Sequence, residues 1–280
     1  MCFQHAQSPE CGGGPYPFMA GFEGTPKKYI AIIHGSELML PNSYQRKFSY
    51  ASLKNFNRII AVSNYTKNLI SDLNLNTIEV IPNGFSVSND ENKHQIQHQL
   101  EHLNLITVGN VSQRKGQQNV VKAIPILLKT YPNLKYRIVG IPTEKDNIEN
   151  LAKELEVEEN IEFYGKVSEE KRNQLLASSS IFMMLSEKTG NGAVEGFGIA
   201  VLEANAFGIP AIGSKGCGIE DAINHKETGC LVDETDINSV LEAINEINHS
   251  YLDYSKNAIQ WSKKFSWKKI VIQYLEILNK

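Results

Sequence analysis

Short runs of β-branched and other apolar residues alternate along this chain with longer amphipathic segments, and this alternation constrains the fold more than any other feature. The runs predict strands at residues 29–33, 58–62, 77–81, 104–108, 136–139, 161–164, 181–185, 210–213 and 230–232. The segments between them predict helices at residues 115–130, 148–155, 169–177, 199–207, 236–247 and 266–278. Strands that alternate with helices are typical of parallel sheets with crossover helices, so we predict an α/β fold.

A polar segment divides the chain into two unequal parts. Residues 86–103 read SVSNDENKHQIQHQLEHL and carry almost no apolar stripe, which is typical of a linker. We therefore predict a smaller domain at 1–88 with three strands, a linker at 89–103 and a larger domain at 104–265 with six strands. Three strands make a thin sheet for an independent domain. The Gly- and Pro-rich residues 1–28 are expected to be poorly ordered or only loosely packed.

Charge and cysteine content exclude several classes of protein. A net charge of −3 provides no general basic field for nucleic acid. The apolar runs are far shorter than the ~20 residues that span a bilayer, and the opening MCFQHAQSPECGGG lacks the parts of a secretory signal. The four cysteines form no CxxC pair and are expected to be free thiols. These features predict a globular cytoplasmic protein.

Four generic motifs are absent or incomplete. The chain contains no GxxxxGK[ST] phosphate loop, no DxD pair of the kind that holds a divalent metal with a nucleotide sugar, and no GxSxG nucleophile elbow. The stretch GNGAVE at 190–195 begins like a dinucleotide-binding loop but places Glu195 where the last glycine is needed. P-loop NTPases and nucleophile-elbow hydrolases therefore have no support.

Residues 187–220 form the densest cluster of candidate functional residues. The order is strand, Gly-rich loop, helix from about residue 199 and a second strand, so the loop delivers free backbone N–H groups to the positive end of a helix. Gly196 and Gly198 allow close approach to the backbone. Glu195 and Glu203, separated by seven residues, can accept hydrogen bonds from vicinal hydroxyls. The alternative is a plain glycine turn followed by a solvated helix face.

A second strand–loop–helix cluster reads VGNVSQRKG at 108–116. Arg114 and Lys115 stand at the expected start of the helix, where the helix dipole disfavours cations. A bound diphosphate would explain their position, whereas the alternative is two solvated side chains. A third cluster consists of His94, His98 and His102, whose spacing of four suits one helix face. Because they lie among polar linker residues without a Cys or Asp partner, we interpret them as a solvated helix and expect no metal site there.

Taken together, the two glycine clusters resemble family-4 retaining glycosyltransferases. The resemblance rests on VGNVSQRKG, FYGKVSEE, the Glu–seven–Glu segment EGFGIAVLE with ANAFGIPAIGS, GCGIEDAI and ETGCLVD. Upstream, IIHGSE, AVSNYTKNLI and VIPNGF resemble the end of the family's N-terminal domain. FSWKKIVIQYLEIL at 265–278 resembles the family's last helix, so residues 266–280 are expected to form a helix that crosses back to the N-terminal domain. The resemblance implies the GT-B fold, in which a Rossmann-like donor domain faces a second Rossmann-like domain, here smaller and incomplete.

The family's functional residues can be carried over position by position. The resemblance implies that Arg114 and Lys115 hold the donor diphosphate, that Glu203 holds the ribose hydroxyls, and that the backbone of residues 165–167 frames the base. It assigns the transferred sugar and distal phosphate to Glu195 and the amides of residues 197–199, and places His34 near the reacting centre. The implied catalytic residues are His34, Glu195 and Lys115. The implied donor-binding residues are Asn110, Arg114, Lys115, Val167, Glu195, Gly196, Phe197, Gly198, Ile199 and Glu203.

Two departures from the family pattern affect the expectation. Asn110 stands where the family often has Arg, which leaves the phosphate grip to two basic residues. The family's early strands and their glycine-rich loop have no counterpart, so the chain is expected to begin inside the N-terminal domain.

The implied activity is transfer of a hexose from a nucleoside-diphosphate sugar to a hydroxyl on a glycan or glycolipid, with retention by front-face attack and without a cofactor or required metal. Peripheral contact with the inner face of a membrane is compatible with such an acceptor. The alternative hypotheses are a non-catalytic nucleotide-sugar-binding subunit and one half of a split enzyme completed by a partner chain.

Overall fold

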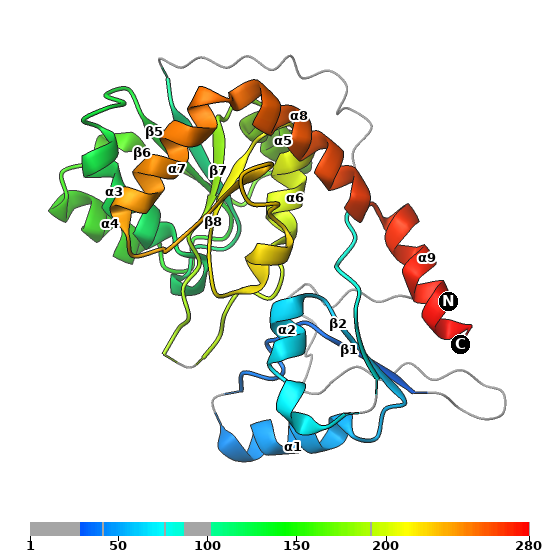
Figure 1. The fold of residues 1–280 in the computed structure, drawn as a ribbon. Helices are drawn as coiled ribbons and strands as arrows, with labels where there is room; N and C mark the ends of the chain where they lie inside the picture. Colours follow the sequence, from blue (N-terminus) through cyan, green and yellow to red (C-terminus); the bar gives the residue numbers. More distant parts are fainter. Residues whose placement is uncertain (1–28, 41, 76, 87–101, 191, 280) are drawn as a thin grey trace.

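The computed structural model describes residues 29–40, 42–75, 77–86, 102–190 and 192–279. Within them the chain forms two parallel sheets with helices packed on their faces (Figure 1). The predicted α/β fold is therefore confirmed. Residues 1–28 and most of the predicted linker lie outside the described residues, as do His94 and His98.

The smaller sheet has the strand order β1-β2-β3, with all strands parallel. Its strands are β1 (Ile30–Ile33), β2 (Arg58–Ala61) and β3 (Thr77–Val80). Helices α1 (Ser43–Leu53) and α2 (Asn64–Asn68) connect them. Two small cores, one on each face, hold this unit together: Ala31, Ile33, Leu53 and Ile59 belong to one, and Ile60 and Ile81 to the other.

The larger sheet has six parallel strands in the order β6-β5-β4-β7-β8-β9. The strands are β4 (Asn104–Val108), β5 (Lys135–Val139), β6 (Ile161–Gly165), β7 (Ile181–Met184), β8 (Ala211–Ser214) and β9 (Gly229–Val232). The chain order reverses between β4 and β7, which pair side by side. In open parallel sheets, ligands bind beyond the carboxyl ends of the strands at such a switch point.

Helices cover both faces of the larger sheet. One core includes side chains of α3 (Gln117–Leu127), α4 (Lys145–Glu154) and α7 (Ile237–His249). The other includes side chains of α5 (Glu169–Ala177) and α6 (Ile199–Ala206), with Trp261 of α8 (Tyr251–Ser262) packed against it. Strands β7 and β8 are buried along their whole length, as expected for the centre of a sheet covered on both sides.

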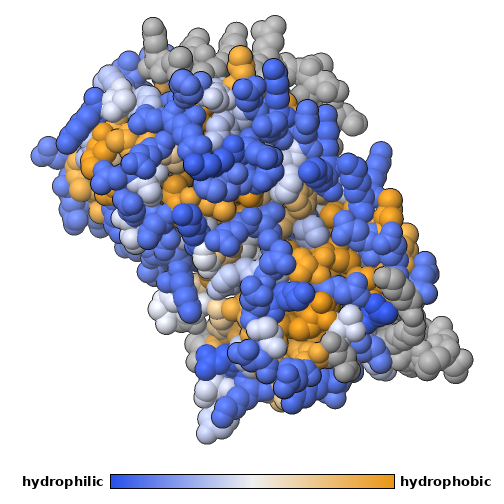
Figure 2. All heavy atoms as spheres, in the orientation of Figure 1, coloured by the Kyte–Doolittle hydropathy of each residue, from blue (hydrophilic) through white to orange (hydrophobic). Residues whose placement is uncertain are grey.

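Helix α9 (Trp267–Leu278) leaves the larger unit and packs on the smaller sheet (Figure 1). Ile270 and Ile277 of α9 join Ile60 and Ile81 in one core. Where the chain crosses back, Phe85 and Ser266 form a β-bridge, and a Cβ on Gly84 would lie 2.6 Å from the Trp267 ring. In Figure 2, apolar side chains gather where α9 meets the small sheet, and Val271, Ile272 and Leu275 remain more than 40% exposed.

Candidate functional site

The sequence-predicted site residues lie in the loops that follow the carboxyl ends of β1, β4, β6 and β7 and on the first turns of α6. Two ion pairs form their centre. Glu195, in the loop before α6, accepts a hydrogen bond from Arg114, and its Oε2 lies 2.9 Å from Lys115 Nζ. The side chains of Glu195 and Lys115 are only 12% and 14% exposed, so both ions are largely removed from water. The Lys115 chain runs across Gly109 at the end of β4, with Cε 3.3 Å from where a Cβ would stand.

The two cations control the charge of Glu195. Burial by itself raises the pKa of the Glu195 carboxyl, but the charges of Lys115 and Arg114 outweigh burial and hold this pKa below its ordinary value of 4.5. Glu195 is therefore ionised at neutral pH. One carboxylate thus occupies the two basic side chains that the family resemblance assigns to a diphosphate.

The predicted helix at 115–130 is wrong at its start. Arg114 and Lys115 lie in a separate 3₁₀ turn, Gln113–Lys115, and α3 begins only at Gln117. Gly116 separates the two elements with φ of 76°, and a Cβ there would lie 1.7 Å from the carbonyl oxygen of Leu185. Glycine is required on both counts, and the break turns the basic pair toward Glu195 rather than along the helix axis.

Glycine is needed at positions 196 and 198 of the loop for two different structural reasons. Gly196 was predicted to let a ligand approach, but the space of its absent side chain is taken by the His34 carbonyl oxygen, 2.1 Å from the ideal Cβ position. Gly196 is thus needed where the two units meet. Gly198 has φ of 94° and caps the start of α6 without a side-chain hydrogen bond. Glycine adopts this left-handed conformation without the strain that a Cβ would impose.

The start of α6 offers unused backbone donors. Within the described residues, the N–H groups of Phe197, Gly198 and Ile199 donate no hydrogen bond. The Phe197 ring is buried, 5.9 Å from the Phe265 ring, so its N–H is fixed in place. Free N–H groups at the positive end of a helix suit an anion.

Glu203 lies one turn further along α6, and its nearest cation is Arg172 of α5, at 3.6 Å. Burial raises the pKa of Glu203 above 4.5 and Glu169 adds to the rise, while Arg172 and Lys115 oppose it. The structure thus places the two carboxylates of the Glu–seven–Glu segment in different electrostatic settings.

Three further predicted residues, His34, Asn110 and Val167, lie in the loops that follow β1, β4 and β6. His34 follows β1 and is exposed, and its carbonyl lies against Gly196. Asn110 follows β4 and is exposed, with its carbonyl accepting from Gln117 Nε2 at 3.1 Å. Val167 lies between β6 and α5, half-buried against the core that contains Phe197. The structure therefore brings His34, Arg114, Lys115, Glu195 and Gly196 together, while within the described residues no hydrogen bond or ion pair joins Asn110 or Val167 to them.

Sequence reasoning missed three charged residues that shape this region. Glu187 accepts from Gln113 at 2.6 Å and from Asn119 at 3.0 Å, which ties the loop after β7 to the basic turn. Asp221 accepts from the backbone N–H and the side-chain amide of Asn64, which joins the larger unit to α2 of the smaller one. Arg172, which lies 3.6 Å from Glu203, is the third. None of these has a local sequence signal, because each partner lies tens of residues away.

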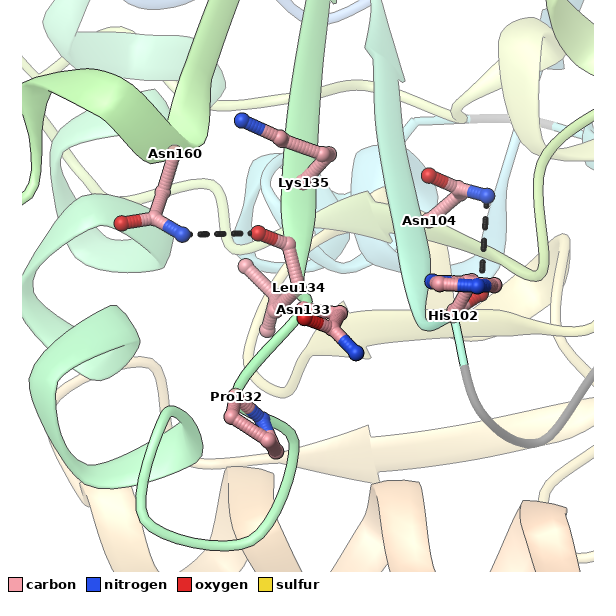
Figure 3. Close-up of a pocket in the computed structure, with 7 residues that line it drawn as sticks. All are labelled: His102, Asn104, Pro132, Asn133, Leu134, Lys135 and Asn160. Carbon is pink, nitrogen blue, oxygen red and sulfur yellow. Dashed lines mark hydrogen bonds between the residues drawn. The ribbon is translucent and has the colours of Figure 1, made fainter.

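A separate pocket lies away from these residues. A hollow of about 460 Å³ opens at the amino ends of β4 and β5, lined by His102, Asn104, Pro132, Asn133, Leu134, Lys135 and Asn160 (Figure 3). Several of its polar groups already bind one another, including Asn160 Nδ2 to the Leu134 carbonyl at 2.8 Å. It lies at the opposite edge of the sheet from Lys115 and Glu195, so we do not assign the site to it.

Among the described residues, no three His, Cys, Asp or Glu side chains converge as a metal site, and no helix has the length and apolar character needed to cross a membrane. Cys217 and Cys230 are buried free thiols, and burial raises the pKa of each to about 11.

Comparison with known proteins identifies the family. The family model described as "Glycosyl transferases group 1" matches residues 88–265, and that described as "Glycosyltransferase Family 4" matches residues 5–89. The chain therefore belongs to glycosyltransferase family 4, and its larger unit is a group 1 glycosyltransferase domain. The structure of HepE from Anabaena in complex with UDP and glucose has a TM-score of 0.73 at 20% identity, over 90% of this chain and 71% of that one. This likeness confirms the predicted GT-B fold.

Two curated relatives are named enzymes. A GDP-mannose-dependent monoacylated alpha-(1-6)-phosphatidylinositol monomannoside mannosyltransferase of Corynebacterium glutamicum is 29% identical over 258 residues, covering 83% of this chain and 64% of that protein. An N-acetyl-alpha-D-glucosaminyl L-malate synthase of Bacillus anthracis is 32% identical over 176 residues, covering 61% of this chain and 43% of that protein. The chain thus spans less than two thirds of the length of either relative.

Proposed function

We propose that this chain transfers a hexose, with retention of configuration, from a nucleoside-diphosphate sugar to a hydroxyl of a glycan or glycolipid. The observation that carries the proposal is the position of Glu195, held between Arg114 and Lys115 beside the free N–H groups at the start of α6. Such an arrangement offers two cations and a helix end to a diphosphate and a carboxylate to sugar hydroxyls.

A bound diphosphate would replace Glu195 as the partner of Arg114 and Lys115. Arg114 and Lys115 now contact Glu195, and a diphosphate entering beside α6 competes for the same donors. Charge-assisted hydrogen bonds of this type contribute about 1.5–3 kcal/mol each. When the cations turn to phosphate, the Glu195 carboxylate becomes available to hydroxyls of the transferred sugar.

Catalysis then depends on stabilising the leaving group. As the glycosidic bond to phosphate lengthens, negative charge grows on the diphosphate, and Lys115 and Arg114, released from Glu195, stabilise this charge together with the α6 N–H groups. The acceptor hydroxyl attacks from the same face, and a departing phosphate oxygen takes its proton. The family resemblance supports this front-face course. His34, whose carbonyl lies against Gly196, would face the reacting carbon from the smaller unit.

In this proposal the protein's own cations supply the charge that a metal supplies elsewhere, so the reaction needs no metal. The names of two relatives support this choice of acceptor class, since one is named for a phosphatidylinositol monomannoside and the other for L-malate. We favour a glycolipid or surface polysaccharide as the acceptor, processed on the cytoplasmic side of a membrane.

A donor panel tests the proposal. The thermal midpoint of the protein would be measured with UDP, GDP and their glucose, mannose, galactose and N-acetylglucosamine derivatives. A ligand present at 100 times its Kd stabilises the folded state by about 2.7 kcal/mol, which is easily resolved. Stabilisation by one nucleotide sugar, followed by sugar transfer to a lipid or glycan extract, supports the enzyme. Stabilisation without hydrolysis or transfer indicates a binding subunit, and no stabilisation by any donor refutes the site.

A further inference from the structure

Arg172 is a cation beside the site to which the family resemblance assigns no role. It lies on α5, and its Nη1 is 3.6 Å from Oε1 of Glu203 on α6. The two side chains are 28% and 27% exposed, so the pair is partly shielded from water. In the part of the chain that the structure describes, no other cation lies within ion-pair distance of Glu203.

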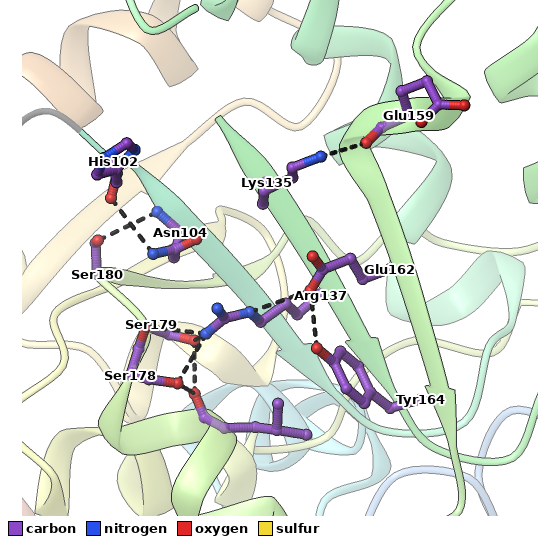
Figure 4. Close-up of polar contacts among 11 residues, drawn as sticks. His102, Asn104, Lys135, Arg137, Glu159, Glu162, Tyr164, Ser178, Ser179 and Ser180 are labelled. Carbon is purple, nitrogen blue, oxygen red and sulfur yellow. Dashed lines mark hydrogen bonds and ion pairs between the residues drawn. The ribbon is translucent and has the colours of Figure 1, made fainter. Parts of the chain in front are cut away.

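The position of Arg172 is fixed by the anchoring of its helix. Ser168 caps the start of α5, accepting from the Lys171 N–H at 3.2 Å. At the other end, Arg137 of β5 donates to the Ser178 carbonyl at 2.9 Å and also pairs with Glu162 (Figure 4). The Nε and Nη2 atoms of Arg172 donate to Asn173 Oδ1 at 3.3 and 3.2 Å, and Nη2 also lies 3.5 Å from Oε1 of the exposed Glu169. Only Nη1 is left for Glu203.

The length of this ion pair matters. At 3.6 Å it lies beyond hydrogen-bond range, and no described residue donates a hydrogen bond to the Glu203 carboxylate. A carboxylate has about four acceptor positions. Arg172 therefore compensates the charge of Glu203 while leaving its oxygens available for two hydroxyl donors.

The charges that face Glu203 come from two elements. Arg172 and Glu169 approach from α5, and Lys115 approaches from the 3₁₀ turn. Burial raises the pKa of Glu203, and of the two opposing cations Arg172 has the larger effect. Lys115 is already paired with Glu195. Removal of Arg172 thus leaves a partly buried carboxyl without a close counter-ion.

We propose that Arg172 is a positioning residue for the donor: it keeps Glu203 ionised and oriented so that this carboxylate accepts the two ribose hydroxyls of the nucleotide. The inference rests on the proposed function, which assigns Glu203 to the ribose. Replacing Arg172 by Leu weakens nucleoside-diphosphate binding roughly threefold to tenfold at neutral pH. The loss grows as the pH falls, because the unpaired carboxyl takes up a proton at a higher pH than in the wild type.

The test measures affinity by calorimetry for UDP, GDP and their 2′-deoxy counterparts, from about pH 8 down to about pH 5.5. The variants are Arg172→Leu, Arg172→Lys, Glu203→Gln and the Arg172→Leu/Glu203→Gln double variant. Lys171→Leu is the matched control, because Lys171 lies next in sequence and faces the Tyr164 ring at 5.9 Å instead of Glu203. We expect Arg172→Leu to weaken the ribonucleotide more than the deoxynucleotide, to shift the pH profile upward and to have little further effect when Glu203 is already Gln. Lys at position 172 restores most of the affinity.

The possible outcomes distinguish a failure of the proposed function from a failure of the role inferred for Arg172. If the wild type binds neither nucleoside diphosphate, the proposed function itself fails. If the wild type binds but Arg172→Leu has the same pH profile, or weakens ribo- and deoxyribonucleotides equally, Arg172 does not act through the ribose and this inference alone is overturned. Additive losses in the double variant overturn it as well. Thermal unfolding of each variant identifies any that fails to fold. If Arg172→Leu fails to fold, the pH profiles and nucleotide affinities of Arg172→Lys are compared with those of the wild type instead.

Discussion

Replacing Gly196 by Ala should separate the two units of this protein without damaging the donor site. Gly196 lies in the loop before α6, and its ideal Cβ position is 2.1 Å from the carbonyl oxygen of His34, which belongs to the smaller unit. The backbone of Gly196 does not have positive φ, so alanine fits it without torsional strain. The clash is between backbone and Cβ, and no side-chain rotation relieves it.

The displacement follows from the geometry. Carbon and carbonyl oxygen approach to roughly 3.3 Å in close contacts. The shortfall from 2.1 Å is therefore about 1.2 Å, which the loop or the unit interface must supply. A misplacement of about 1 Å in a reacting geometry costs on the order of a hundredfold in rate. Nucleotide affinity should change by less than about threefold, because Arg114, Lys115 and Glu203 all lie in the larger unit.

Three measurements check this prediction: sugar transfer, nucleoside-diphosphate affinity, and hydrogen exchange of the Asn64 amide. The last does not depend on activity, because the Asn64 N–H donates to Asp221 across the units and loses protection if they move apart. Gly190→Ala is the matched control in the same loop, since a Cβ there would meet nothing within 4 Å. Wild-type transfer rates and Asn64 protection in Gly196→Ala would refute the reasoning and mean that the loop shifts away from His34 freely.

Three further predictions concern the charges of the site. Glu195→Gln should tighten binding of a nucleoside diphosphate several-fold while reducing transfer, because Arg114 and Lys115 lose the carboxylate that competes with the phosphate. Lys115→Ala and Glu203→Ala should each weaken this binding roughly tenfold without unfolding the protein. Calorimetry measures these affinities, and unchanged affinity in all three variants contradicts the site. Transfer should persist in excess EDTA, and complete loss that manganese or magnesium restores would show a metal-dependent reaction. Since the pKa of Glu195 is lower in the folded protein than the ordinary 4.5, its ionisation stabilises the fold above about pH 4.5 and this contribution disappears as the pH falls through the folded value. Urea unfolding should therefore show that the stability advantage of wild type over Glu195→Gln at about pH 6 shrinks as the pH falls below about 4.5; a constant difference would contradict the ion pairs.

Strands and helices were predictable from sequence to different degrees. Each of the nine predicted strands matches an observed strand to within one residue at either end, because every one is a compact apolar run. Helices α1, α2 and α8 were not predicted. Helix α8 buries Tyr251, Tyr254, Ser255, Ala258 and Ser262, so its inner face is made of small and hydroxyl-bearing residues that no hydropathy pattern distinguishes from loop.

The candidate site, too, was predictable from the sequence only in part. The sequence alone determines that a Gly-rich loop enters a helix at 195–199, that a basic pair follows β4, and that two carboxylates stand with seven residues between them, because each is a local pattern of neighbouring residues. Only the tertiary structure determines which of these residues are in contact. Arg114 contacts Glu195 across 81 positions, Arg172 approaches Glu203, and Gly196 faces the His34 carbonyl. Those contacts depend on the packing of α5, α6 and the two sheets, and an ion pair between distant residues leaves no periodicity in the sequence to reveal it.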